Sequence, residues 1–202
     1  MVDSEHGGML LGRHTPVVQE YSPHLLYAIP RATARLTLGV REPLPFNGVD
    51  LWHAYEMSWL DYTGKPAVWV GRFSVPATSP NIIESKSFKL YLNSLNSTRF
   101  ASDEAARATI IADISVAAGA AVTLELFPVG AAALAGMTLS GTCLDSLSIT
   151  PWSGGPTAAQ LQIQPERTVE ERVFSHLLRS LCPVTGQPDW ATVWLHYRGT
   201  AI

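Results

Sequence analysis

The spacing of the apolar residues changes between residues 67 and 95, and this change constrains the fold more than any other feature. Over residues 67–75, apolar and polar positions alternate, which is typical of a strand with two different faces. One face carries Trp69, Gly71, Phe73 and Val75, and the other carries Val68, Val70, Arg72 and Ser74. Over residues 88–95, Phe88, Tyr91, Leu92 and Leu95 instead recur at the three- and four-residue spacing of a helix. The chain therefore places an amphipathic helix soon after a strand, and the two can share one core.

The flanking segments extend this pattern into a small mixed domain. An aromatic-rich run at 51–60 precedes the strand, and 61–66 has the composition of a hairpin turn. A second helix is expected to begin at Ser102 and to end at Gly119. Further alternation at 122–127 and 137–144 predicts two more strands. The order strand, strand, helix, helix, strand, strand predicts an α+β fold with two helices on one face of an antiparallel sheet.

Composition narrows the possible partners. The chain has 202 residues, of which 47% are hydrophobic and 15% are charged, so it can bury a core. A net charge of -3 gives no basic excess, so neither nucleic acid nor an anionic membrane is an expected partner. Residues 1–13 lack the pattern of a signal peptide, and the longest apolar run, 117–136, is interrupted by Glu125 and Pro128. A cytoplasmic protein without a membrane span is expected.

The two cysteines, Cys143 and Cys182, are too few for a disulfide framework and form no CxxC pair. The six histidines show no ligand-like spacing, so no metal site is expected. Cys143 falls in the predicted strand at 137–144 and is therefore expected in the core.

The run 84–94 is the first segment with possible chemistry. Glu84, Ser85 and Lys86 lie near a helix N-terminus, where free backbone N–H groups and a nearby cation suit a nucleotide phosphate. The residues alone favour the alternative, an amphipathic helix with a solvated face.

The run 182–190 is the second such segment. Its two prolines and its glycine favour a tight, rigid loop. Cys182 can act as a nucleophile only as its thiolate, so it needs a neighbour that manages its proton. Asp189 can do this if the loop folds back. The alternative is a buried structural cysteine beside a turn-forming aspartate.

Together these runs resemble the nitrile reductases that make 7-aminomethyl-7-deazaguanine, and residues 45–52 and 142–145 resemble their long, two-module type. The resemblance implies the tunnelling fold (T-fold), with one complete module and the start of a second. The implied division is an N-terminal arm at 1–46, a first module at 47–150, a linker at 151–167 and a second module from 168 to 202. It also implies a strand at 168–180, although the spacing of Val173, Leu177 and Leu178 fits a helix.

The resemblance further implies an oxidoreductase of queuosine biosynthesis for tRNA. It would reduce the nitrile of 7-cyano-7-deazaguanine to an aminomethyl group with two molecules of NADPH. Cys182 would attack the nitrile carbon to form a thioimide, and Asp189 would be the general acid. Ile83, Glu84 and Ser85 would line the substrate site, and Ser85 and Lys86 would contact NADPH. No metal would be needed, and a homodimer is expected.

Two further features complete the expectation. The family also uses a His–Glu pair for the substrate base and an Arg–Gly pair for the cofactor, later than Ile202, so residues 1–202 alone are expected not to turn over substrate. The alternatives are another T-fold enzyme acting on a purine or pterin with zinc, which metal analysis would reveal, and an inactive relative that binds or assembles. Covalent attachment of the nitrile at Cys182 separates the latter from an enzyme.

Overall fold

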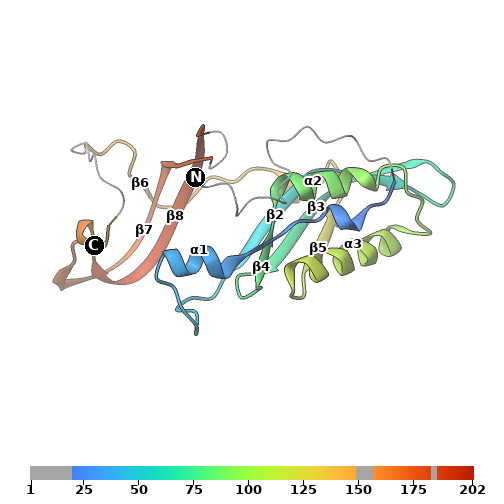
Figure 1. The fold of residues 1–202 in the computed structure, drawn as a ribbon. Coiled ribbons are helices and arrows are strands. Elements are labelled where there is room, and N and C mark those ends of the chain that lie inside the picture. The colour runs from blue at the N-terminus through green and yellow to red at the C-terminus, as the bar shows by residue number, and fades with distance from the viewer. Residues whose placement is uncertain (1–19, 149–156, 183–185) are drawn as a thin grey trace. The chain divides into compact units, whose positions relative to one another are not determined.

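The computed structural model describes residues 20–148, 157–182 and 186–202. The chain divides into two compact units, Met1–Ala135 and Gly136–Ile202, and each is described by itself. Figure 1 shows the α-helices in the first unit and a long pair of strands in the second. Within the described ranges, no helix has both the length and the apolar character needed to cross a membrane.

An antiparallel sheet forms the base of the first unit. It contains β2 (Val49–Leu60), β3 (Pro66–Pro76) and β5 (Thr123–Phe127), in the order β2-β3-β5. The hairpin predicted between the first two strands is confirmed: the Asp61 carboxylate accepts hydrogen bonds from the backbone N–H groups of Thr63, at 2.8 Å, and Lys65, at 3.0 Å. An aspartate that caps its own turn in this way fixes the register of both strands.

Two helices pack on this sheet, as predicted. They are α2 (Ser85–Ser94) and α3 (Asp103–Ala118). Ser102 caps α3, its hydroxyl accepting a hydrogen bond from the Ala105 N–H at 3.1 Å. Gly119 ends the helix with a φ of 69°, a left-handed conformation that glycine adopts without strain.

The core lies between the helices and the sheet. All four residues of the apolar stripe predicted for α2 are buried, and the Phe73 and Phe88 rings meet edge to face with their centroids 5.0 Å apart. The fully buried large side chains of this core are Met57, Trp59, Phe73, Tyr91, Leu95, Ile110, Ile114 and Leu124. Because the two helices and the sheet all contribute to one cluster, the start of α2 is held rigidly against the sheet.

The described part of the N-terminal arm packs on the same unit. It contains η1 (Pro23–Leu25), β1 (Ala28–Pro30) and α1 (Arg31–Thr37), and β1 pairs antiparallel with β4 (Asn81–Ile83). The Tyr27 N–H donates to the Ser87 hydroxyl at 3.0 Å, and the Glu84 N–H donates to the Tyr27 carbonyl at 2.9 Å. The arm therefore helps to fix the N-terminus of α2. A short 3-10 turn, η2 (Ala132–Leu134), lies near the end of this unit.

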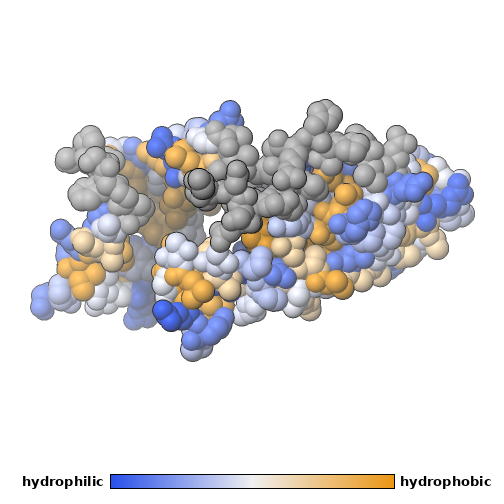
Figure 2. Space-filling view, in the orientation of Figure 1, coloured by the Kyte–Doolittle hydropathy of each residue, from blue (hydrophilic) through white to orange (hydrophobic). Residues whose placement is uncertain are grey.

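The second unit is built on a long hairpin. It contains β6 (Thr142–Cys143), η3 (Ala158–Gln160), β7 (Gln164–Leu181) and β8 (Pro188–Ala201), with the sheet order β6-β7-β8. The strand implied at 168–180 is confirmed, since pairing with β8 overrides the helical spacing. Among the described residues of this unit, Ala201 is the one buried hydrophobic residue. Figure 2 accordingly shows hydrophobic side chains on the surface over β7 and β8.

The strand predicted at 137–144 is wrong over most of its length. Only Thr142–Cys143 is extended and paired, and this short strand runs parallel to β7 in the second unit instead of joining the first sheet. Gly141, with a φ of 121°, breaks the extended run just before it. The prediction that Cys143 lies in the core is also wrong, because its side chain is exposed.

Candidate functional site

Glu84 is the residue that starts α2. Its carboxylate caps the helix, accepting hydrogen bonds from the Lys86 N–H at 2.9 Å and the Ser87 N–H at 2.7 Å. The Glu84 side chain is 3% exposed, and burial of a carboxylate is tolerated when donors satisfy it in this way. Glu84, Ser85 and Lys86 thus lie at a helix N-terminus, as predicted.

This cap corrects one part of the prediction. Free backbone N–H groups were expected to receive a phosphate, but the Glu84 carboxylate already takes those of Lys86 and Ser87. A second anion at the same N–H groups would be repelled by that carboxylate. What remains for a cofactor phosphate is the exposed Ser85 and the side-chain cations of α2.

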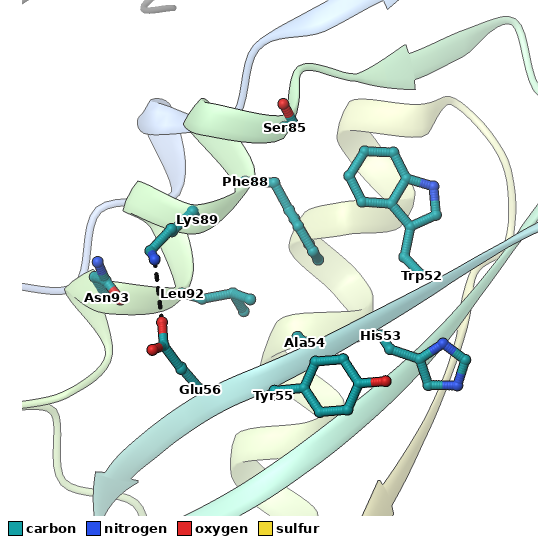
Figure 3. A pocket seen from close by; sticks show the side chains of 10 residues that line it. All are labelled: Trp52, His53, Ala54, Tyr55, Glu56, Ser85, Phe88, Lys89, Leu92 and Asn93. Carbon is teal, nitrogen blue, oxygen red and sulfur yellow. Dashed lines mark hydrogen bonds and ion pairs between the residues drawn. The ribbon is translucent and has the colours of Figure 1, made fainter. Parts of the chain in front are cut away.

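A pocket of about 430 Å³ opens beside this helix, between α2 and β2. Figure 3 shows Ser85 and Phe88 on the helix side and Trp52 on the strand side. The lining residues are Trp52, His53, Ala54, Tyr55, Glu56, Ser85, Phe88, Lys89, Leu92 and Asn93. An aromatic wall with two hydroxyls, from Ser85 and Tyr55, and charged groups at the rim fits a flat, polar ring system.

Ile83 lies beside this pocket. It is buried, and it lines a smaller apolar cavity together with Trp52 and Phe88, which also line the larger pocket. The structure therefore brings Ile83, Glu84, Ser85 and Lys86 together at one end of α2.

The pocket also contains residues that the sequence did not single out. Lys89 and Glu56 face each other at its rim with their charged atoms 3.1 Å apart, and both side chains are mostly exposed (Figure 3). The strand β2 changes register between Ala54 and Met57, and such a bulge redirects the intervening side chains, Tyr55 and Glu56. The aromatic-rich composition of 51–60 was the available signal, but a bulge cannot be located from composition.

Cys182 lies in the second unit, just after β7. The loop does fold back, since the Cys182 N–H donates to the Gln187 carbonyl and the Gly186 N–H donates to the Cys182 carbonyl, both at 2.8 Å. Gly186 has a φ of 68°, which closes the turn without the strain that a Cβ would bring. The Cys182 side chain is half-buried, so the alternative of a fully buried structural cysteine is not supported.

The strand register brings Asp189 to the same side of the hairpin as Cys182. Asp189 pairs with Ser180, and Pro188 pairs with Leu181. Because side chains alternate along a strand, Cys182 shares a face with Ser180 and hence with Asp189. Diagonal neighbours of this kind are separated by roughly 7–8 Å between backbone positions, within reach of a water-bridged proton transfer.

Comparison with known proteins shows which family this chain resembles. The family model described as "Nitrile reductase, 7-cyano-7-deazaguanine-reductase N-term" matches residues 17–126, which include the whole pocket. Three relatives are each named NADPH-dependent 7-cyano-7-deazaguanine reductase. The relative from Teredinibacter turnerae is 51% identical over 199 residues, covering 98% of this chain and 71% of its own length. The one from Dechloromonas aromatica is 50% identical over 204 residues, covering 100% and 72%. The one from Bordetella pertussis is 50% identical over 193 residues, covering 95% and 71%.

The family model matches more than half of the chain. The relatives are about 50% identical to the chain over almost its whole length. The chain belongs to the family of NADPH-dependent 7-cyano-7-deazaguanine reductases.

Proposed function

We propose that this chain takes part in reducing the nitrile of 7-cyano-7-deazaguanine to an aminomethyl group, a step of queuosine biosynthesis for tRNA, with NADPH as the reductant. The observation that supports the proposal is the register of the β7–β8 hairpin, in which Asp189 pairs with Ser180, two residues before Cys182. A nitrile carbon is a weak electrophile, so its reduction benefits from a thiol nucleophile and a positioned proton donor.

Cys182 and Asp189 have complementary roles in this proposal. The Cys182 thiolate adds to the nitrile carbon, and the nitrile nitrogen takes a proton from Asp189, so that a covalent thioimide forms without a leaving group. After the first reduction of the thioimide, loss of the Cys182 thiolate would break the C–S bond and leave an imine, which the second reduction would take to the amine. Gly186 holds Cys182 at the mouth of the turn, which keeps the thiol accessible while its backbone is fixed.

The substrate base is proposed to bind at the start of α2. Trp52 and Phe88 offer aromatic faces on which a flat deazapurine can stack. Ile83 supplies an apolar contact, and Ser85 a hydroxyl. Each Glu84 oxygen accepts one backbone hydrogen bond and retains a second lone pair, which can accept from an N–H of the base.

The residues near this pocket also fit NADPH. Ser85 is exposed at its edge, and Lys86 follows in the first turn of α2, where an ammonium group can pair with a phosphate. NADPH, when bound, supplies the hydrides that take the nitrile to the amine. Since the Glu84 carboxylate occupies two N–H groups of the helix end, the phosphate contact is assigned to the Ser85 and Lys86 side chains.

The proposal includes the wider architecture. The arm at 1–46 is proposed to precede a first T-fold module at 47–150, and the hairpin from 168 to 202 is proposed to start a second module after the linker at 151–167. Residues 151–156 of that linker lie outside the described residues. A homodimer is proposed, because β2 pairs only with β3 among the described strands and exposes Leu51 and Tyr55. A location in the cytoplasm is proposed as well.

The proposed role of Asp189 is tested by measuring how fast the chain captures the substrate covalently. The chain is incubated with 7-cyano-7-deazaguanine at a series of pH values, and the rate of adduct formation is measured by intact-protein mass spectrometry. Asp189→Asn is expected to slow capture by about a hundredfold, because proton donation of this kind typically contributes that much or more. Glu166→Gln, an exposed change on β7, is the matched control and should react at the unaltered rate. Equal rates for Asp189→Asn and the unaltered chain would contradict the assigned role.

A second measurement tests the cofactor contact. Titration of NADPH fluorescence should show that Lys86→Ala weakens binding by about tenfold or more, since one charge-assisted phosphate contact is lost. Lys65→Ala, in the exposed β2–β3 turn, should leave the affinity unchanged. If both variants bind NADPH like the unaltered chain, the cofactor is held elsewhere.

A further inference from the structure

A cysteine, an aspartate and a histidine come together in the second unit. None of the three belongs to the turn that carries Cys182. Cys143, Asp145 and His176 each offer one ligand atom, and these atoms all lie within 4.8 Å of one another. Cys143 and His176 are exposed and Asp145 is half-buried, so an ion can reach them from solvent. We propose that these three side chains form a binding site for a zinc-class divalent metal ion.

The backbone register explains why the three residues meet. Cys143 pairs with Phe174 in the parallel β6–β7 ladder, and the Leu144 N–H donates to the Phe174 carbonyl at 2.9 Å. Two residues further along each chain, Asp145 lies beside His176, whose backbone N–H donates to both carboxylate oxygens at 3.2 Å. This pairing and the hydrogen bonds from the His176 N–H bring the ligand atoms of all three side chains together.

Gly141 fixes the approach of the segment that carries two of these residues. It has a φ of 121°, and a Cβ at this position would overlap the Arg172 carbonyl oxygen. Only glycine allows this close contact between the two backbones. The position of Cys143 and Asp145 beside β7 is therefore set by the backbone before any ion binds, as a binding site requires.

His176 is also held in a defined orientation. Its Nδ1 lies 2.8 Å from the Thr192 hydroxyl on β8, and its ring meets the Phe174 ring at an angle of 69°. Metal-bound histidines are commonly oriented by such a hydrogen bond through the other ring nitrogen. With Nδ1 engaged by Thr192, we assign Nε2 as the ligand atom.

The donor set selects the class of ion. A thiolate and an imidazole favour zinc and its neighbours in the first transition row, whereas magnesium and calcium prefer oxygen ligands alone. Zinc–ligand bonds of about 2.0–2.3 Å place tetrahedral ligand atoms roughly 3.3–3.8 Å apart, so small side-chain rotations close the present spacing. Three protein ligands leave a fourth position for water. The bound ion would clamp residues 142–145 to the β7–β8 hairpin.

Cobalt is the probe for this site, because Co²⁺ replaces zinc and reports thiolate ligation by a charge-transfer band in the near ultraviolet. The tag-free, reduced chain is titrated with Co²⁺, and Zn²⁺ is then added. One ion per chain should bind with the charge-transfer band, and Zn²⁺ should remove the band by displacement. Absence of saturable binding at micromolar concentrations of the chain would overturn the proposal.

Variants identify the ligands. Cys143→Ser should abolish the charge-transfer band, and Asp145→Asn and His176→Gln should each weaken binding by at least about tenfold. The matched controls are Cys182→Ser, the other cysteine of the described chain, and His196→Gln, a histidine of β8 that lies 3.0 Å from Glu170. Both controls should keep the band. A band that survives Cys143→Ser and disappears in Cys182→Ser would refute the site.

Unaltered protein provides an independent readout if a variant fails to fold. Alkylation by iodoacetamide is followed at each cysteine by peptide mass spectrometry, with and without Zn²⁺. Zinc should slow alkylation of Cys143 by at least about tenfold relative to the metal-free protein. Alkylation of Cys143 at the same rate with and without zinc would count against the proposal.

Discussion

Two carboxylates, Glu84 and Asp113, show how single side chains organise the first unit. Glu84 caps α2, and one oxygen of Asp113 accepts hydrogen bonds from the Tyr21 hydroxyl at 2.7 Å and the Tyr91 hydroxyl at 2.6 Å. Asp113 thereby ties the arm and α2 to α3. The sequence predicts that Glu84 stands at a helix start, but it cannot reveal which donors a carboxylate finds, because those depend on the tertiary packing.

The cap on α2 gives a stability prediction. Replacing Glu84→Ala leaves the N–H groups of Lys86 and Ser87 without their acceptor, so the free energy of unfolding should fall by about 1–2 kcal/mol. Lys89→Ala, which removes only an exposed ion pair, should change it by less than about 0.5 kcal/mol. Urea unfolding followed by circular dichroism measures both. Equal stabilities of the two variants would show that the cap contributes nothing.

The tyrosine pair gives a pH prediction. Burial, helped by the hydrogen bond to Asp113, raises the pKa of Tyr21 to about 12 and the pKa of Tyr91 further still. An unfolded tyrosine has a pKa of about 10, so the folded state retains protons that the unfolded chain releases above that pH. The contribution of these hydroxyls is therefore complete below about pH 10 and is lost as the pH rises through the folded pKa.

The measurement is the free energy of unfolding between about pH 10 and pH 12. It should fall less steeply in Tyr21→Phe than in the unaltered chain, because one raised pKa has been removed. Tyr62→Phe, at an exposed turn, is the control and should follow the unaltered chain. The linkage is disproved if the slope for Tyr21→Phe matches that of the control.

At the scale of elements, the helices and hairpins that local pattern defines were predicted, and those that depend on distant partners were not. The apolar stripe of α2, the cap and end of α3, and the turn at Asp61 are all encoded within a few residues. In contrast, Thr142–Cys143 pairs with Val173 and Phe174, about thirty residues away, and alternation alone cannot name that partner. The cluster of Cys143, Asp145 and His176 could not be found by a motif search for the same reason, because His176 is about thirty residues from the other two.

The turn that presents Cys182 gives an element-scale prediction. Gly186→Ala must place an alanine at a φ of 68°, which costs about 1–2 kcal/mol, and it should disturb the turn that holds the thiol. Gly199→Ala on β8 is matched, because a Cβ meets no atom within 4 Å at either position, and only Gly186 of the two has a positive φ. Gly186→Ala should lower stability and slow capture of the nitrile. Identical behaviour of the two variants would contradict the role given to the turn.

At the scale of the whole molecule, resemblance supplied what local patterns could not. The strand at 168–180 has helical spacing, and its identification as β7 came from the likeness of 182–190 to a nucleophile segment. The turn between Cys182 and Asp189 could be anticipated, since two prolines and a glycine lie between them. The walls of the α2 pocket could not, because they depend on a bulge in β2 and on how α2 packs across it.

Self-association is a prediction at this scale. The exposed edge of β2 should meet a second copy of the chain, and size-exclusion chromatography with light scattering should give the mass of a dimer. Leu51→Lys, on β2, should shift the chain to a monomer, because a charge would replace an exposed apolar side chain at the contact. Val116→Lys, on the exposed face of α3, should remain dimeric. A monomeric unaltered chain at all concentrations, or a dimeric Leu51→Lys, would exclude this interface.

The account depends most directly on a bond between the Cys182 sulfur and the nitrile carbon. Peptide mass spectrometry of the chain after exposure to 7-cyano-7-deazaguanine should find the full mass of the substrate added at Cys182, with exposed Cys143 unmodified and no adduct in Cys182→Ala. The same adduct in Cys182→Ala, or a substrate mass at Cys143 instead, would contradict it.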